Sequence, residues 1–301
     1  METDIDLHIL DLNFLNLPHV IASYLIVGPE GPVLVETGPS TVIETLKMRL
    51  AEHGYAPSDV RHILLTHIHL DHAGAAGWWA QQGAHIHVHH VGAPHLVDPS
   101  KLINSARRIY GETFDALWGE IRPVPADRIT ALYDNDTIHV GGLTFTALDT
   151  PGHARHHHVF RLGDIAFTGD AAGVRMPSSP LISLPAPPPE FDREAWRVTL
   201  DRLVKENFRT IYPTHFGAVE HVRAHLDAFR ALMDESVEWI RVKMEAGVTR
   251  DKMVTQYITW YRQRATALGI SEEEINQQAG ANPAFMSVDG LMRYWKKMGI
   301  E

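Results

Sequence analysis

The chain has 301 residues and a formal net charge of −10, with 45% hydrophobic and 21% charged residues, which suits one large globular domain or one domain with an appendage. The acidic balance argues against a nucleic-acid partner, and the absence of cysteine excludes disulfides, zinc–thiolate sites and cysteine nucleophiles. The first residues lack the basic start of a signal peptide and no apolar run is long enough for a membrane span, so we expect a cytoplasmic protein without a membrane partner.

Short β-rich runs alternate with helical patterns in the first half of the chain. The run "GPEG" (28–31) is typical of a hairpin turn between two such strands. Period-2 and period-3.6 apolar patterns predict strands at 20–27, 32–37, 61–66 and 84–90, and helices at 40–54 and 73–83.

A second set of β-rich runs begins near residue 136. A hairpin is predicted at 136–150, with Gly141 and Gly142 in its turn, and a strand–turn–strand unit follows at 158–170. The proline-rich segment 176–192 excludes regular structure, and we expect an ordered loop that could lie over a site. A helix at 193–207 and a strand at 209–214 complete this set.

From about residue 218 to Glu301 the sequence is helical in pattern, and Ser271 to Glu274 predicts a capping box for one of its helices. Two β-rich sets interleaved with helices indicate two packed sheets with helices outside, an α+β fold. We therefore predict a catalytic domain at 1–220 and a C-terminal helical subdomain at 221–301.

The run "LLTHIHLDHAG" (64–74) places three histidines and an aspartate within six positions after a predicted buried strand. His67 and His69 alternate, so in an extended segment both imidazoles can point the same way. Asp71 and His72 then begin a turn into a helix. Four ligands in one short loop are too many for one four-coordinate zinc if other ligands converge there, whereas two adjacent ions would use them all.

Further candidate ligands follow other predicted strands in the same manner. His153 comes after a Pro-Gly turn, Asp170 ends "IAFTGD", and His215 ends "TIYPTH". With the loop at 67–72, these residues make seven candidate ligands at the ends of strands.

The ordered set of H-x-H-x-D-H, PGH, GD and a late H-F-G resembles the metallo-β-lactamase-fold superfamily over roughly residues 5 to 220. The resemblance implies a four-layer αββα sandwich, to which the C-terminal helices are added. It implies one metal held by His67, His69 and His153, a second held by Asp71, His72 and His215, and Asp170 bridging both.

Several residues near these ligands have roles that the pattern leaves more open. The resemblance assigns Glu36, where most relatives have aspartate, and His157 to the support of the ligands. Arg155 and Arg175 could bind an anionic group of the substrate, although an exposed surface charge is the simpler interpretation of each. His85, His87 and His89 have no evident carboxylate partner and suit a structural or solvent-facing role, and His156 and His158 stay unassigned.

Within the superfamily, the sequence favours the glyoxalase-II-like and lactonase-like hydrolases. No export signal and no cysteine ligand are present, against true β-lactamases, and His69 stands where oxygen-reducing di-iron relatives usually have glutamate. The expected reaction is attack of a metal-bridging hydroxide, oriented by Asp71, on the carbonyl of a thioester, lactone or other ester. The alternatives are a mononuclear-iron persulfide dioxygenase, which would use His67, His153 and Asp170, and a two-metal phosphodiesterase.

The expected cofactors are two divalent metal ions per chain, with zinc favoured over iron or manganese. The expected partner is a small-molecule substrate, and the apolar residues of the C-terminal helices could also form a homodimer interface.

Overall fold

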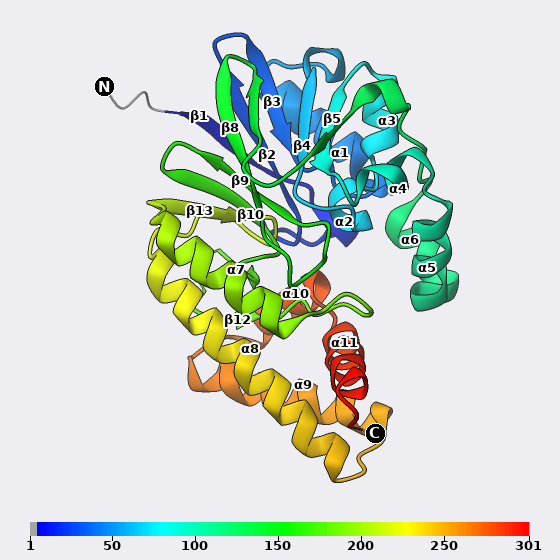
Figure 1. Ribbon diagram of the computed structural model, residues 1–301, viewed down its shortest axis with the longest axis vertical. Coiled ribbons are helices and arrows are strands. Elements are labelled where there is room, and N and C mark those ends of the chain that lie inside the picture. The colour runs from blue at the N-terminus through cyan, green and yellow to red at the C-terminus, as the bar shows by residue number, and fades with distance from the viewer. Residues whose placement is uncertain (1–4, 178, 301) are drawn as a thin grey trace.

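The computed structural model describes residues 5–177 and 179–300. Residues 1–4, Ser178 in the proline-rich segment and Glu301 at the end of the predicted helical region lie outside the described residues. Two β-sheets pack face to face, and helices cover the outer face of each sheet (Figure 1).

The first sheet has six strands in the order of the chain. They are β1 (Asp6–Asp11), β2 (Ala22–Gly28), β3 (Gly31–Val35), β4 (His62–Leu65), β5 (His85–His89) and β6 (Ile129–Leu132). The first three are antiparallel and the last four, from β3 onward, are parallel, so the carboxyl ends of β3, β4, β5 and β6 share one edge of the sheet.

The second sheet has five strands in the order β13-β10-β9-β8-β7. Their bounds are β7 (Thr137–Val140), β8 (Leu143–Asp149), β9 (His158–Leu162), β10 (Ile165–Gly169) and β13 (Thr210–Pro213). Only β10 and β13 pair in parallel, and two short strands, β11 (Val174–Arg175) and β12 (Ile182–Ser183), form a separate ribbon.

The period-2 alternation of β4 explains how the first sheet supports two cores. Ile63 and Leu65 point to the cluster shared with the outer helices, whereas Leu64 points to the cluster between the two sheets. All three side chains are fully buried. A strand that is apolar on both faces belongs in the middle of a layered fold, because each face contacts another layer.

The outer helices divide between the two sheets. The first sheet is covered by α1 (Ile43–Glu52), α2 (Leu70–Ala73), α3 (Ala76–Gln81), α4 (Ala93–Val97), α5 (Ser100–Tyr110) and α6 (Phe114–Trp118). The second core cluster includes residues of α7 (Arg193–Glu206), α8 (Val222–Glu245), α9 (Arg250–Ala267) and α11 (Ala284–Lys297), and α10 (Glu272–Ala281) packs beside them. Short 3-10 turns lie at Phe14–Asn16, Ser40–Val42, Pro57–Asp59, Gly111–Thr113 and Ala126–Arg128.

The predicted layer order, helix, sheet, sheet, helix, and the C-terminal helical region are confirmed, as are the predicted hairpin and its turn. Gly141 and Gly142 both have positive φ, 61° and 72°, which glycine adopts without strain. The proline-rich segment was expected to hold no regular structure, and there the prediction was wrong. Ile182 and Ser183 lie between Pro180 and Pro185, keep their N–H groups, and pair with β11 as β12.

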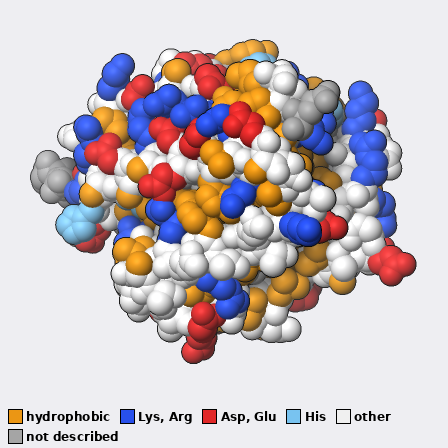
Figure 2. Space-filling view, turned by 90° about the horizontal axis from the view of Figure 1, so that it is seen from below, with side chains coloured by type: hydrophobic (Ala, Val, Ile, Leu, Met, Phe, Trp, Pro, Cys, Tyr) orange, Lys and Arg blue, Asp and Glu red, His pale blue; other side chains and the backbone are white. Residues whose placement is uncertain are grey.

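None of the helices within the described ranges is both long and apolar enough to cross a bilayer. The end of the molecule formed by the C-terminal helices carries basic, acidic and apolar side chains side by side (Figure 2). Ion pairs on these helices join Arg241 to Glu238 and Arg250 to Asp289.

Candidate metal centre

The loop after β4 presents the histidine cluster because the chain stays extended there and then turns sharply into α2. His69 is the extended residue before α2 (φ −61°, ψ 152°), and Asp71 and His72 fall in the first turn of that helix. The loop leaves the carboxyl edge of the first sheet, where ligand sites of parallel strands form.

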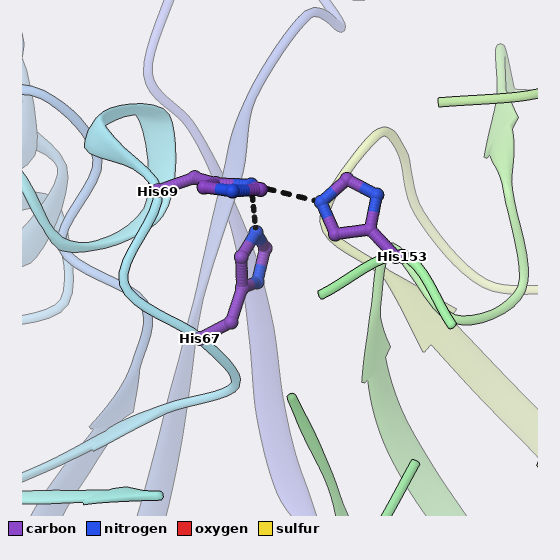
Figure 3. A group of neighbouring side chains, drawn as sticks. All are labelled: His67, His69 and His153. Carbon is purple, nitrogen blue, oxygen red and sulfur yellow. Dashed lines mark hydrogen bonds between the residues drawn. The ribbon is translucent and has the colours of Figure 1, made fainter. Parts of the chain in front are cut away.

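The first group of candidate ligands is His67, His69 and His153, from two loops that are distant in the sequence. His67 Nε2 lies 3.0 Å from His69 Nδ1, and His69 Nδ1 lies 2.9 Å from His153 Nε2 (Figure 3). His67 and His153 are buried, and the three imidazoles point one nitrogen each toward a common point. Converging imidazole nitrogens are the ligand set that zinc and similar ions prefer.

The second group is Asp71, His72 and His215. His215 Nε2 lies 3.4 Å and His72 Nε2 lies 3.7 Å from Asp71 Oδ2. His215 follows β13 in the second sheet, so this group joins the two sheets at their shared edge.

Asp170 lies between the two groups. Its Oδ2 is 3.3 Å from His153 Nε2, whereas its Oδ1 is 3.4 Å from His72 Nε2 and 3.7 Å from His215 Nε2. One carboxylate thus turns one oxygen toward each group, as a bridging ligand would.

The far sides of the His153 and His215 rings are each held by a backbone carbonyl, which orients the ring and selects its tautomer. His153 Nδ1 donates to the Pro185 carbonyl at 2.8 Å, and His215 Nδ1 donates to the Val20 carbonyl at 2.6 Å. Both Nε2 atoms are therefore unprotonated in the neutral rings and free to bind a cation.

Glu36 lies buried beneath the metal loop. Its Oε1 accepts from the Thr66 N–H at 3.3 Å, from the Thr66 hydroxyl and from the Thr214 hydroxyl at 3.4 Å, and it lies 3.5 Å from His72 Nδ1. Glu36 also has a positive φ of 68°, a conformation that costs a non-glycine residue about 1–3 kcal/mol. These contacts tie the carboxylate to both strand ends that carry candidate ligands.

His157 and His156 differ in what they contact. His157 Nε2 accepts from the Asp170 N–H at 3.2 Å, and its Nδ1 lies 2.9 Å from the Thr150 hydroxyl, so it supports the backbone of the bridging residue. His156 Nε2 lies 3.0 Å from Glu190 Oε2, and the same oxygen lies 3.6 Å from His69 Nε2. The sequence patterns give no sign of Glu190, because only the folded proline-rich segment brings it to these histidines.

The charges of the centre are arranged to receive a cation. Burial, together with the neighbouring histidines, lowers the pKa of His67 well below its usual value, and burial lowers the pKa of His153 to about 4. Burial alone would lower the pKa of His72, but Asp71 and Asp170 raise it well above the usual value. In the absence of a metal, these carboxylates therefore draw a proton onto His72.

Buried polar atoms without partners are a second, independent sign that the described residues fit divalent metal ions. Both ring nitrogens of His72 and the Oδ1 of Asp170 are buried without a hydrogen-bond partner among the described residues. Buried polar atoms without partners are rare and costly, and a bound cation would satisfy Asp170 Oδ1 and His72 Nε2. The donor set of nitrogen and carboxylate oxygen suits zinc and other first-row metals.

His89, Asp149 and His158 also lie close enough together to suggest a metal site, but hydrogen bonds explain this group. His89 Nδ1 accepts from the Val91 N–H at 3.0 Å, so the neutral ring carries its proton on Nε2, which donates to Asp149 Oδ1 at 3.1 Å. This ring has no free lone pair for a metal. His89 therefore has a carboxylate partner, contrary to the expectation, but in a structural role.

A cavity of about 320 Å³ opens beside the candidate ligands. Arg155 lies on its wall, whereas Arg175 does not: the Arg175 guanidinium donates to the Ser179 carbonyl at 2.5 Å. The cavity is also lined by Lys101, Leu102, Ala106, Ile109, Tyr110, Trp118, the segment 185–190 and Met286.

Comparisons with known proteins identify a family for the chain and show the same fold in other proteins. The sequence model of the metallo-beta-lactamase superfamily matches residues 17–215. A metallo-beta-lactamase fold-containing protein of Sulfurisphaera tokodaii is 24% identical over 262 residues, which cover 84% of this chain and 93% of that one. The crystal structure of a metallo-beta-lactamase family protein from Thermus thermophilus superposes with a TM-score of 0.69 at 24% identity, over 97% of this chain and 94% of that one.

A relative with a stated activity matches a smaller part of the chain. The atrochrysone carboxyl ACP thioesterase of Aspergillus fumigatus is 28% identical over 181 residues, which cover 58% of this chain and 42% of the thioesterase.

Proposed function

The chain belongs to the metallo-beta-lactamase superfamily, whose members are mostly metal-dependent hydrolases, and from this membership we propose that it hydrolyses a thioester, lactone or other ester at a centre with two metal positions. Within the superfamily, the proposal places it with the glyoxalase-II-like and lactonase-like enzymes. One distant relative is named as a thioesterase, which supports the ester class.

The observation that carries the proposal is the position of Asp170. Its two oxygens face different groups, with Oδ2 near His153 and Oδ1 near His72. One group would consist of His67, His69 and His153, and the other of Asp71, His72 and His215. Divalent ions held there would supply a Lewis acid that polarises a carbonyl oxygen and would lower the pKa of water to about 7.

The protein's own residues would contribute orientation and exclusion of solvent. Asp71 lines the cavity and ends 3.4 Å from His215 Nε2, so its carboxylate can orient a water molecule as well as bind metal. Burial would raise the pKa of Asp71, but His72 and His215 lower it, and the group is therefore ionised at neutral pH and able to bind a cation or accept a hydrogen bond from water. The lowered pKa values of buried His67 and His153 keep these two rings neutral at pH 7.

The test is substitution of Asp170 with a readout of metal content. Asp170→Asn should hold fewer than two equivalents of zinc after dialysis and should lose at least about a hundredfold in turnover of a responsive ester. Asp164→Asn removes a surface carboxylate that pairs with Arg209 and should change neither measurement.

A panel of a thioester, a lactone and bis-p-nitrophenyl phosphate then identifies the reaction class. Retention of two zinc ions and full activity by Asp170→Asn would contradict the proposed centre. Turnover of the phosphodiester alone, or one iron per chain with oxygen uptake on a persulfide, would replace the ester hydrolase with one of the alternative activities.

A further inference from the structure

The cavity beside the candidate ligands has one apolar wall, and α5 supplies much of it. Leu102, Ala106 and Ile109 are spaced four and three residues apart on this helix and all line the cavity. Trp118 of α6 and Met286 of α11 line it as well. Side chains of this kind bind hydrocarbon by removing it from water.

The two ends of α5 differ in what they contact. Tyr110, in the last turn of α5, lines the cavity together with Asp71 and His215. Lys101 lies nine residues earlier, a rise of about 14 Å along the helix axis. The lining of the cavity therefore extends along α5 from the side of the candidate ligands to Lys101.

Among the charged residues that line the cavity, the carboxylates have partners within the protein and the cations do not. Each of the three carboxylates contacts histidine: Asp71 lies near His215, Asp170 near His153 and Glu190 near His156. Lys101 and Arg155 also line the cavity and are exposed, yet within residues 5–177 and 179–300 neither side chain makes a hydrogen bond or an ion pair. Two cations are thus left for a ligand in a protein whose net charge is −10.

We propose that the substrate is an ester or thioester with an apolar acyl part, which lies along the α5 wall, and a leaving group that carries a phosphate, which Lys101 and Arg155 bind. The proposal rests on the proposed function, which fixes the reacting carbonyl at the metal end of the cavity. Arginine offers several fixed N–H donors and lysine a compact charge, and both side chains are suited to binding phosphate.

The reaction is ordinary hydrolysis and needs no further reactant than water. The carbonyl carbon gains the oxygen of water, its bond to the leaving sulfur or oxygen breaks, and the leaving group takes up the proton. The products are a carboxylic acid with an apolar chain and a thiol or alcohol that still carries its phosphate.

The binding test uses inert thioethers, so that it does not depend on turnover. Calorimetry with the zinc-loaded protein compares S-octyl-coenzyme A with S-octyl-pantetheine, which differ in the phosphorylated part, and with S-ethyl-coenzyme A, which lacks most of the chain. We expect the octyl coenzyme A compound to bind about tenfold or more tightly than the pantetheine compound. We also expect the octyl chain to bind more tightly than ethyl, by up to about fourfold for each buried methylene.

The matched variants are Lys101→Gln/Arg155→Gln and, as a control, Arg108→Gln, which changes an exposed arginine of α5 outside the cavity. The double variant should lose the preference for the phosphorylated ligand, and the control should keep it. Equal binding of the two octyl ligands by the unchanged protein, or a preference that survives in the double variant, would overturn the inference.

A separate measurement of octanoyl-coenzyme A and octanoyl-pantetheine hydrolysis tests the proposed function. Turnover of both thioesters at equal efficiency supports the hydrolase and contradicts the phosphate site. Selective binding of the phosphorylated thioether, together with no turnover of any ester in the panel, supports the phosphate site and contradicts the hydrolase.

Discussion

Glu190 brings a carboxylate of the proline-rich segment close to the first group of candidate ligands. Its Oε2 lies 3.0 Å from His156 Nε2 and 3.6 Å from His69 Nε2. His69 directs its other nitrogen, Nδ1, at His67 and His153. A carboxylate near Nε2 favours the proton on that nitrogen and leaves Nδ1 free for a metal.

We therefore expect Glu190→Gln to weaken zinc binding by about tenfold or more, because the amide attracts the Nε2 proton of His69 less strongly than the carboxylate does. The measurement is a competition titration with a chromogenic chelator. Glu190→Asp, which keeps the charge, should recover part of the affinity.

Glu194→Gln serves as the control, because Glu194 accepts a hydrogen bond from the Tyr294 hydroxyl and does not line the cavity. If Glu190→Gln and Glu194→Gln bind zinc as tightly as the unchanged protein, Glu190 does not position His69.

His87 is a buried histidine outside the candidate centre that should make stability depend on pH. Its side chain lies on β5, its Nε2 is 3.2 Å from His62 Nδ1, and its Nδ1 is buried without a partner among the described residues. Burial, reinforced by His85 and His62, lowers the pKa of His87 to about 3. The unfolded chain takes up this proton near pH 6.5, so stability is complete above that pH and is lost as the pH falls from 6.5 toward 3.

The variant His87→Gln removes this titration. Between pH 6.5 and pH 5, the unfolding free energy of the metal-free protein should fall more steeply than that of the variant, by about 1.4 kcal/mol per pH unit at most. Urea titrations at four pH values measure the difference, with the exposed residue in His221→Gln as the control. Parallel pH profiles for protein and variant would show that His87 is protonated in the folded state.

The sequence predicts the seven candidate ligands because each lies in a loop or turn that follows a strand, where the local sequence sets its position. The structure brings these residues together in two groups with Asp170 between them. Glu190 and Lys101 could not be predicted in the same way. Each reaches the cavity from an element whose position depends on tertiary packing, and neither belongs to a recognisable motif.

At the scale of elements, strands with a continuous or an alternating apolar pattern were well predicted. The predicted strands at 61–66 and 84–90 correspond to β4 and β5 within a residue or two at each end. By contrast, the helices α4, α5 and α6 were not predicted. The spacing of Leu102, Ala106 and Ile109 is a signal that could have revealed α5.

The predicted capping box at the start of α10 is confirmed. The Ser271 hydroxyl accepts from the Glu274 N–H at 3.2 Å, and the Glu274 carboxylate accepts from the Ser271 N–H at 3.1 Å. We expect Ser271→Ala to lower the unfolding free energy by about 1 kcal/mol, because a helix N–H loses its acceptor.

Thermal and urea unfolding measure this effect, with Thr266→Ala as the control. Thr266 is exposed and its hydroxyl bonds only within α9, so alanine there should be neutral or slightly stabilising. An unchanged stability of Ser271→Ala would show that the start of α10 is held by packing rather than by its cap.

At the scale of the whole molecule, the proposed boundary near residue 220 separates two stretches of chain that share one core. Phe229 of α8 packs on Trp196 of α7 with ring centroids 5.4 Å apart, and both belong to the cluster that includes Val159 of the second sheet. We propose that the C-terminal helices are a separate segment of the sequence but fold together with the two sheets as one cooperative unit.

The same helices hold the segment that leads to the candidate centre. The Asn282 amide and the Ser287 hydroxyl both donate to the Leu184 carbonyl, at 2.9 and 2.6 Å. The next residue, Pro185, accepts from His153 Nδ1. The position of α11 is thereby coupled to the orientation of a candidate ligand.

Gly290 on α11 offers a test of this coupling, because a Cβ there would fall inside contact distance of the Ala186 carbonyl oxygen. Gly290→Ala should push α11 away from the proline-rich segment, lower the unfolding free energy by about 1–3 kcal/mol and also weaken zinc binding, since Pro185 would shift with Ala186.

Gly280→Ala in α10 is the matched control: its Cβ would meet only flexible side-chain atoms of Leu17 and Val20, and alanine is the better helix former. Because the core is shared, calorimetry should show one unfolding transition in all three proteins. A Gly290→Ala protein with lowered stability but unchanged zinc affinity would mean that α11 stabilises the fold without acting on the metal centre.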